Sequence, residues 1–109
     1  MSGVKLTRHV NEALKLFEFV RKELDSWVGV QTCFAFLLIV KHTHVNQEEM
    51  RVMDIGAMMA TSSASASRNM HWLVKHRLIE LYENPDRRIE KFVRLTKKGK
   101  ELVKRLEGL

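Results

Sequence analysis

Residues 78–96 of the chain read LIELYENPDRRIEKFVRLT, and this stretch predicts a β-hairpin with a charged tip. Two short runs in which apolar and polar residues partly alternate, LIELYE and IEKFVRL, flank the segment NPDRR. Pro85 is the only proline in the chain, and it presets the backbone φ of a turn between turn-forming asparagine and aspartate. The hairpin is therefore expected to hold Arg87 and Arg88 out at its tip.

The segment before the hairpin, TSSASASRNMHWLVKHRLI, has the apolar spacing of an amphipathic helix. Ser62 or Ser63 is a good N-cap, because a serine hydroxyl accepts a hydrogen bond from the free N–H groups of a first turn. A projection at about 100° per residue gives one inward apolar stripe, formed by Ala66, Met70, Leu73 and Val74. The opposite side is small at its start and cationic or aromatic further on, with Ala64, Ser65, Arg68, His71, Trp72 and Lys75. Small residues there let the start of the helix approach a surface closely.

Further helices are expected on both sides of this pair. The first runs from Leu6 to Val28, with Phe19 on its polar side, and the apolar run CFAFLLIV is more plausibly a buried central helix than a strand. A short third helix is expected to begin at Asn46, where Glu49 would complete a capping box. After the hairpin, Thr96 caps a last helix. The sequence thus predicts a mainly α fold with a small β-hairpin wing, in the order of four helices, two strands and a fifth helix: a winged helix-turn-helix.

Length and charge narrow the class of protein. A chain of 109 residues forms one domain with a single core, and 19 Lys and Arg against 13 Asp and Glu give a formal charge of +6. A positive balance favours polyanionic partners such as nucleic acid. The longest apolar run is far shorter than the roughly 20 residues of a membrane span, and no signal sequence is evident at the start. We therefore expect a cytoplasmic protein without membrane contact.

Catalytic and metal-binding patterns have little support. The chain shows no Ser-His-Asp order, paired carboxylate cluster or Gly-rich phosphate loop, so we expect no enzyme activity and no cofactor. The lone cysteine, Cys33, has apolar neighbours and is expected to be an inert core residue. His42 and His44 would point in different directions on a helix, which favours loop and surface positions over a metal site.

From about Asp54 to Leu102 the chain resembles the multiple-antibiotic-resistance regulator (MarR) family of winged helix-turn-helix proteins. Ile55-Gly56 stands where that family has a Leu-Ala pair, and the wing closes on Asp86-Arg87-Arg88 followed by Leu95-Thr96-Lys97-Lys98-Gly99. These match the family's Asp-x-Arg tip and Leu-Thr-x-x-Gly signature. Arg77 departs from the pattern, because the family ends its recognition helix there with a glycine. The family pattern would also start the third helix later than Asn46.

The resemblance implies a transcriptional regulator that binds double-stranded DNA. Its recognition helix would offer Ser62, Ser63, Ala64, Ser65, Arg68, Asn69, Trp72 and Lys75. Its wing would offer Asp86, Arg87, Arg88 and Lys91. Arg68 could make two hydrogen bonds to guanine O6 and N7 in the major groove, and Asp86 would orient Arg88 into a narrow minor groove. For Trp72, packing against the wing or a second subunit is an equal alternative.

A homodimer on a pseudo-palindromic operator is the expected assembly, because the apolar arc of the first helix exceeds what one small domain covers. The expected interface joins the first and last helices through Leu6, Val10, Leu14, Phe17, Phe19, Leu102 and Leu106. The single domain 1–109 would then divide into a dimerisation helix (1–29), a helix-turn-helix and wing (46–95) and a C-terminal helix (96–109). Two alternatives remain: a winged-helix module that binds a protein through Phe19 and Trp72, and a ligand-gated sensor with an unknown effector.

Overall fold

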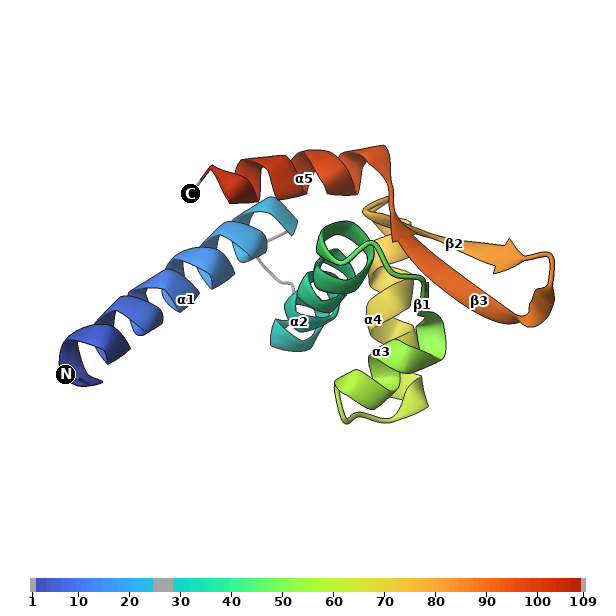
Figure 1. Ribbon diagram of the computed structural model, residues 1–109, viewed down its shortest axis with the longest axis horizontal. Helices are drawn as coiled ribbons and strands as arrows, with labels where there is room; N and C mark the ends of the chain where they lie inside the picture. Colours follow the sequence, from blue (N-terminus) through green and yellow to red (C-terminus); the bar gives the residue numbers. More distant parts are fainter. Residues whose placement is uncertain (1, 25–28, 109) are drawn as a thin grey trace.

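The computed structural model describes the backbone of residues 2–24 and 29–108 (Figure 1), and all of their side chains except those of residues 2–6, 20, 21, 23, 24, 63 and 87–89. Its elements, in chain order, are α1 (Ser2–Leu24), α2 (Val30–Ile39), the π-helical segment η1 (Val40–Val45), β1 (Met50–Arg51), α3 (Val52–Met58), α4 (Ser63–Lys75), β2 (Ile79–Asn84), β3 (Arg87–Leu95) and α5 (Lys97–Glu107). This order confirms the predicted winged-helix class.

The sheet is antiparallel, with strand order β1-β3-β2. Strands β2 and β3 form the predicted hairpin, in register from Ile79 opposite Leu95 to Glu83 opposite Lys91. The short strand β1 was not predicted. It adds Met50 and Arg51 opposite Val93 and Phe92, on the other edge of β3.

The predicted start of the third helix at Asn46 is wrong. Helix α2 continues as the π-helical segment η1 to Val45, and the chain then enters β1, where Met50 is buried. The third helix therefore begins only at Val52. Its first turn is capped by Asp54 in place of Glu49, since Asp54 Oδ2 accepts a hydrogen bond of 3.0 Å from the backbone N–H of Arg51.

The core lies between α2, the helix-turn-helix and the sheet. Its largest fully buried side chains are Phe36, Ile39, Met50, Ile55, Leu73, Ile79 and Val93. The apolar run CFAFLLIV is therefore a central helix, as predicted, and Cys33 is buried within it. The inward stripe of α4 is confirmed as well, with Ala66 and Met70 buried beside Leu73. Within the described residues no helix is both long and apolar enough to cross a membrane.

The end of α4 and the start of α5 are built on each other. Arg77 follows α4 in a left-handed conformation (φ 60°), the backbone shape for which glycine is favoured, and Leu78 N donates to Leu73 O at 3.0 Å in the pattern of a Schellman cap. Thr96 Oγ1 accepts from Gly99 N at 3.1 Å and donates to Arg77 O, so the predicted Thr96 cap is confirmed. A Cβ on Gly99 would lie 2.2 Å from Leu78 O, so only glycine fits there.

Helix α1 packs against the core through the side that carries Leu16 and Phe19. Leu16 and Phe19 are half-buried against the core, whereas Val10, Leu14 and Phe17 are 47%, 54% and 40% exposed. The expectation that Phe19 faces outward is therefore wrong. The N-terminal part of α1 extends away from the rest of the molecule (Figure 1). The whole molecule measures 50 × 27 × 26 Å. One apolar stripe of α1 is thus left uncovered.

Candidate nucleic-acid interface

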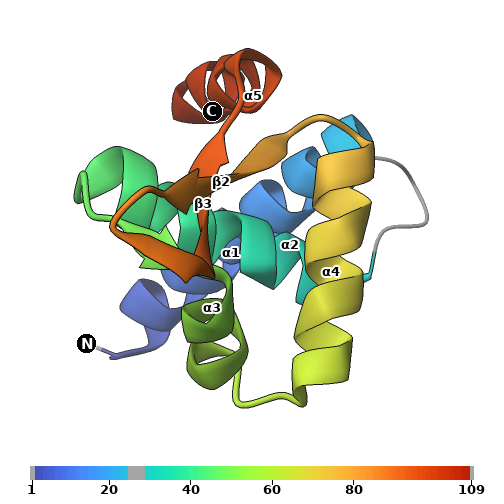
Figure 2. The same ribbon diagram turned by 90° about the vertical axis from the view of Figure 1, so that its right-hand side faces the viewer.

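Helix α4 and the β2–β3 hairpin lie on the same face of the molecule, with α3 between their lower ends (Figure 2). Helix α4 runs beside the hairpin in this view (Figure 2). The side chains on α4 and on the hairpin therefore decide what this face can bind.

The first two turns of α4 carry a chain of polar contacts. Ser62 is the N-cap, and its Oγ accepts from Ser65 N at 3.1 Å, which confirms the predicted cap. The two serine hydroxyls lie 3.2 Å apart, and Arg68 Nη2 donates to Ser65 Oγ at 3.1 Å. These hydrogen bonds hold the Arg68 guanidinium along the outer side of the helix, toward the N-terminus of α4.

The predicted outward side of α4 is largely accessible. Ala64, Arg68, His71 and Lys75 are exposed, and Ser65 is half-buried. The side chain of Ser63 lies outside the described residues. The accessible side thus carries two cationic side chains, Arg68 and Lys75, together with the hydroxyls of Ser62 and Ser65 and the small residue Ala64.

Two residues of the predicted set lie elsewhere. Asn69 Oδ1 accepts a hydrogen bond of 3.0 Å from Thr32 Oγ1 on α2, and Asn69 Nδ2 is buried, so this side chain belongs to the packing of α4 on α2. Trp72 is half-buried against the core and stacks on His76, with 3.8 Å between ring centroids. Neither side chain projects freely from the helix, although the projection had put Trp72 on the outward side and the family resemblance had put Asn69 in the DNA-binding set.

The hairpin tip is a turn closed by its own side chain. Asn84 Oδ1 accepts from Asp86 N at 3.0 Å, and Pro85 and Asp86 are exposed. Lys91 is exposed further along β3. The side chains of Arg87 and Arg88 lie outside the described residues, so the pairing of Asp86 with Arg88 stays a prediction.

Arg94 is a basic wing residue that the sequence analysis missed. Its Nε donates to Glu80 Oε1 at 2.7 Å, and its guanidinium carbon lies 4.7 Å from the centroid of the Tyr82 ring. Glu80 and Arg94 are direct cross-strand partners. The predicted hairpin register could have found this pair, since opposite charges often face each other across strands.

A second missed group is Arg51 with two carboxylates. Arg51 Nη2 and Nε donate to Asp54 at 2.8 and 3.2 Å, and Nη1 donates to Glu90 Oε1 at 2.9 Å. The hydrogen bonds from Arg51 hold the pKa of the Asp54 carboxyl below its usual range, and Asp54 in turn raises the pKa of Arg51. An acidic residue three positions after a helix N-cap is the signal that could have located this group.

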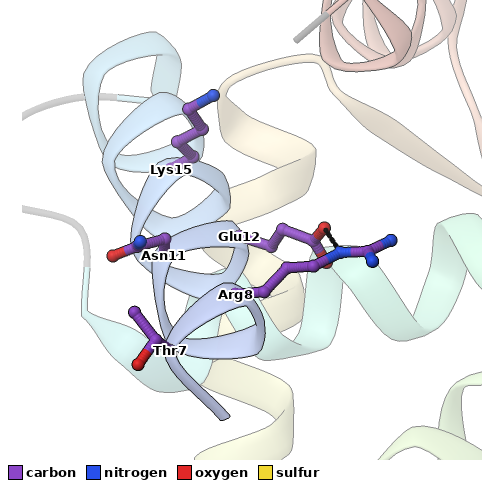
Figure 3. A pocket seen from close by; sticks show the side chains of 5 residues that line it. All are labelled: Thr7, Arg8, Asn11, Glu12 and Lys15. Carbon is purple, nitrogen blue, oxygen red and sulfur yellow. Dashed lines mark hydrogen bonds and ion pairs between the residues drawn. The ribbon is translucent and has the colours of Figure 1, made fainter. Parts of the chain in front are cut away.

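Two hollows accompany these surfaces. A groove of about 1070 Å³ separates the wing from α3 and α4, and its lining includes Met53, Gly56, Ala57, Ala66 and Leu81. A second hollow of about 460 Å³ runs along α1 (Figure 3), lined by Thr7, Arg8, Asn11, Glu12 and Lys15. These five come from one helix, and the only tie drawn between them joins Arg8 to Glu12 at 3.3 Å, so this second hollow is an open surface. Among the described residues no three His, Cys, Asp or Glu gather as metal ligands.

The predicted dimer residues fall into two groups. Val10, Leu14 and Phe17 are exposed on α1, while the side chain of Leu6 lies outside the described residues. Leu102 is only 2% exposed, and Leu106 and Phe19 are half-buried, all against the core of their own chain. Leu102 is therefore removed from the predicted interface, because the core of the same chain already covers it.

Several solved structures share the fold of this chain. The MepR–DNA complex of S. aureus matches 95% of this chain and 81% of its own, at 18% identity and a TM-score of 0.72. RV1404 from Mycobacterium tuberculosis matches over 98% and 69%, at 16% identity and a TM-score of 0.75. The heme sensor PefR from Streptococcus agalactiae, solved with heme, matches over 98% and 73%, at 21% identity and a TM-score of 0.65. No family model and no curated protein sequence matches the chain. The chain shares the fold of these structures, and this is the MarR-like winged-helix fold that its wing signature predicted.

Proposed function

We propose that this protein is a transcriptional regulator that binds double-stranded DNA in a sequence-specific way, as a homodimer on a pseudo-palindromic operator. The observation that carries the proposal is the accessible side of α4, where Ser62, Ser65 and Arg68 are linked by hydrogen bonds. A helix of this kind enters the major groove with its first turns toward the base edges. Arginine is the residue that most often reads guanine there.

The wing supports the same proposal. Its sequence has Arg87 and Arg88 directly after the turn and Lys91 further along β3, and cationic side chains on a wing can contact phosphates or an adjacent minor groove. The neighbour MepR was solved bound to DNA, which is consistent with this use of the shared fold.

Dimerisation is inferred from α1. Its uncovered stripe of Val10, Leu14 and Phe17 lies on a helix that projects from the body of the molecule (Figure 1). An isologous contact between two such stripes removes apolar surface from water in both subunits. Two copies related by a two-fold axis would then present their α4 helices to successive major grooves, about 34–36 Å apart.

The test is selection of bound duplexes from a random DNA pool, followed by sequencing. An enriched inverted repeat with half-sites about one helical turn apart is the expected result. Absence of enrichment at low salt would reject the proposal. A single enriched half-site without a repeat would keep DNA binding and reject the dimeric arrangement.

The rival function, a module that binds a protein partner through Phe19 and Trp72, has weaker support. Both side chains are half-buried within the chain, and Trp72 is already stacked on His76. Salt titration separates the two functions. DNA affinity that depends on several phosphate contacts falls steeply with ionic strength, whereas an aromatic-centred protein interface does not.

A further inference from the structure

Arg51 ties two separate parts of the DNA-binding face together. Its guanidinium forms a two-bond fork with Asp54, within the first turn of α3, and a third bond with Glu90 on β3. The three side chains are 36%, 29% and 27% exposed, so water screens them only in part. A bidentate, partly buried pairing of this kind fixes geometry better than a solvated ion pair.

Glu90 lies next to a β-bulge in the hairpin, on the β3 side of its contact with Arg51. Glu83 pairs with Lys91, but the next residue, Asn84, pairs with Arg87, so residues 88–90 of β3 have no counterparts on β2. Bulges bend a strand and redirect side chains. On the other edge of β3, Arg51 pairs with Phe92, and Glu90 stands two residues before Phe92, which makes Arg51 and Glu90 diagonal neighbours across the strands.

The pairing of β1 with β3 ends at Arg51 opposite Phe92, and toward the tip from there a groove lies beside the wing. The groove of about 1070 Å³ separates the wing from α3 and α4, and Arg51 and Glu90 are both among its lining residues. The part of the hairpin that extends beyond β1 has only two strands, and two strands by themselves are marginally stable, so its direction depends on what holds its base. The Arg51–Glu90 bond is a contact that joins the wing to α3 across this groove.

We propose that Arg51 and Glu90 are positioning residues that set the wing relative to α3 and α4, so that wing and recognition helix meet DNA in one fixed geometry. This inference rests on the proposed DNA-binding function. A wing that is already in place loses less conformational freedom on binding, and the complex gains affinity without an added contact. Arg51 and Glu90 themselves need not touch DNA.

The hairpin provides a matched control in the Glu80–Arg94 pair. It is also an arginine–glutamate contact, with Nε 2.7 Å from Oε1, but it joins β2 to β3 and leaves α3 out. Glu90→Gln and Glu80→Gln therefore each weaken one ion pair of the same hairpin with a change of similar size. Only Glu90→Gln is expected to free the wing from the helix-turn-helix.

The first measurement needs no DNA. Spin labels at Met58→Cys and Glu83→Cys, both exposed positions, report the distance between α3 and the wing in a Cys33→Ala background. We expect a narrow distance distribution for the parent and for Glu80→Gln, and a broader one for Glu90→Gln. An unchanged distribution in Glu90→Gln would overturn the inference, whether or not the protein binds DNA.

The second measurement is a double-mutant cycle on a selected duplex. Glu90→Gln should weaken binding at least about threefold, and Arg88→Ala should then cost less than it does in the parent, since a misplaced wing has already lost its contact. With Glu80→Gln the Arg88→Ala effect should be additive. Additive effects in the Glu90→Gln cycle would reject the positioning role. If the parent binds no duplex at all, the proposed function fails, and the spin-label distances still decide the wing contact.

Discussion

The orientation of the Arg68 side chain is set by two serines that precede it, Ser62 and Ser65. Its bond to Ser65 keeps the guanidinium along the outer side of the helix, and Ser65 is in turn fixed by the N-cap Ser62. A guanidinium held this way loses less side-chain entropy when it meets a base. The bond to Ser65 uses only one of the five N–H donors of the Arg68 guanidinium, so other donors can bond a guanine edge.

Arg68→Ala should therefore remove base reading. We expect a loss of about 1–3 kcal/mol in binding to a selected duplex, with relaxed preference at one base pair in each half-site. Lys75→Ala, on the same accessible side of α4 but further along, is the control and should weaken selected and random duplexes alike. Equal losses for Arg68→Ala on both duplexes would assign Arg68 to the phosphates.

The wing arginine should behave differently from Arg68. Arg88→Ala is expected to weaken binding to most sequences and to lower the salt slope by about one unit per wing. It should also reduce any preference for flanking A·T pairs, because a narrow minor groove attracts guanidinium. Asp86→Ala should reproduce part of this defect, since an unoriented arginine pays more entropy on entering the groove. Salt titrations on selected and random duplexes measure the binding of both variants. Binding by Arg88→Ala equal to that of the parent would mean that the hairpin tip is a tight turn without a role in DNA binding.

At the scale of single residues, the sequence predicted what depends on the local chain. The caps Ser62 and Thr96 and the turn at Asn84 need only backbone atoms a few residues away, and all three are confirmed. The projection of α4 was wrong for Trp72, and the resemblance was wrong for the direction of Asn69, because neither takes account of the neighbouring residues that these side chains contact. Thr32 lies 37 positions away in sequence, and no local pattern announces that contact.

At the scale of elements, the junction between α4 and α5 depends on Gly99. Gly99→Ala would bring a Cβ to 2.2 Å from the carbonyl oxygen of Leu78, a backbone atom that cannot rotate away. We expect a destabilisation of about 1–3 kcal/mol from overpacking, measured by urea unfolding. Gly108→Ala is the control, since its Cβ would meet its nearest neighbour at 3.5 Å. Similar midpoints for the two variants would contradict the close approach.

The first turn of α3 should make stability depend on acid pH. The pKa of Asp54 is lowered by its bonds from Arg51, so its ionised form stabilises the folded state above the ordinary carboxyl pKa. That contribution is lost as the pH falls through the lowered value. The difference in urea midpoint between the parent and Asp54→Asn should be largest near neutral pH and shrink below about pH 4. A difference that stays constant with pH would mean that the charge of Asp54 does not matter.

Element boundaries were predictable only where local signals had no competitor. Asn46 and Glu49 have capping-box spacing, yet no helix begins there, because Met50 is buried in the core as part of β1. The helix begins only after Arg51, and Asp54 caps its first turn. Burial of a large side chain outweighs a cap, which contributes about 1 kcal/mol. The strand β1 has only two residues and pairs with β3 some 40 positions on, so alternation could not reveal it.

At the scale of the molecule, the sequence predicted that α1 has more apolar surface than one domain covers, but not which part. Two stripes compete on this helix: Leu16 with Phe19, and Val10 with Leu14 and Phe17. Helical periodicity predicted only the second stripe and put Phe19 on the polar side, because the shape of the core, which decides which side packs, cannot be read from spacing. The first stripe contacts the core and the second is exposed.

The exposed stripe yields the sharpest test of assembly. Phe17→Asp places a charge where we propose that two subunits meet, and it should convert a dimer into a folded monomer, measured by light scattering at micromolar concentration. Asn11→Asp adds the same charge on the polar side of α1, where Asn11 is one of the residues in Figure 3, and should leave the dimer intact. Phe19→Asp, in contrast, should lower the urea midpoint, because Phe19 packs against the core. A parent protein that is already monomeric would remove the basis for a two-half-site operator, and a Phe17→Asp dimer would move the interface away from α1.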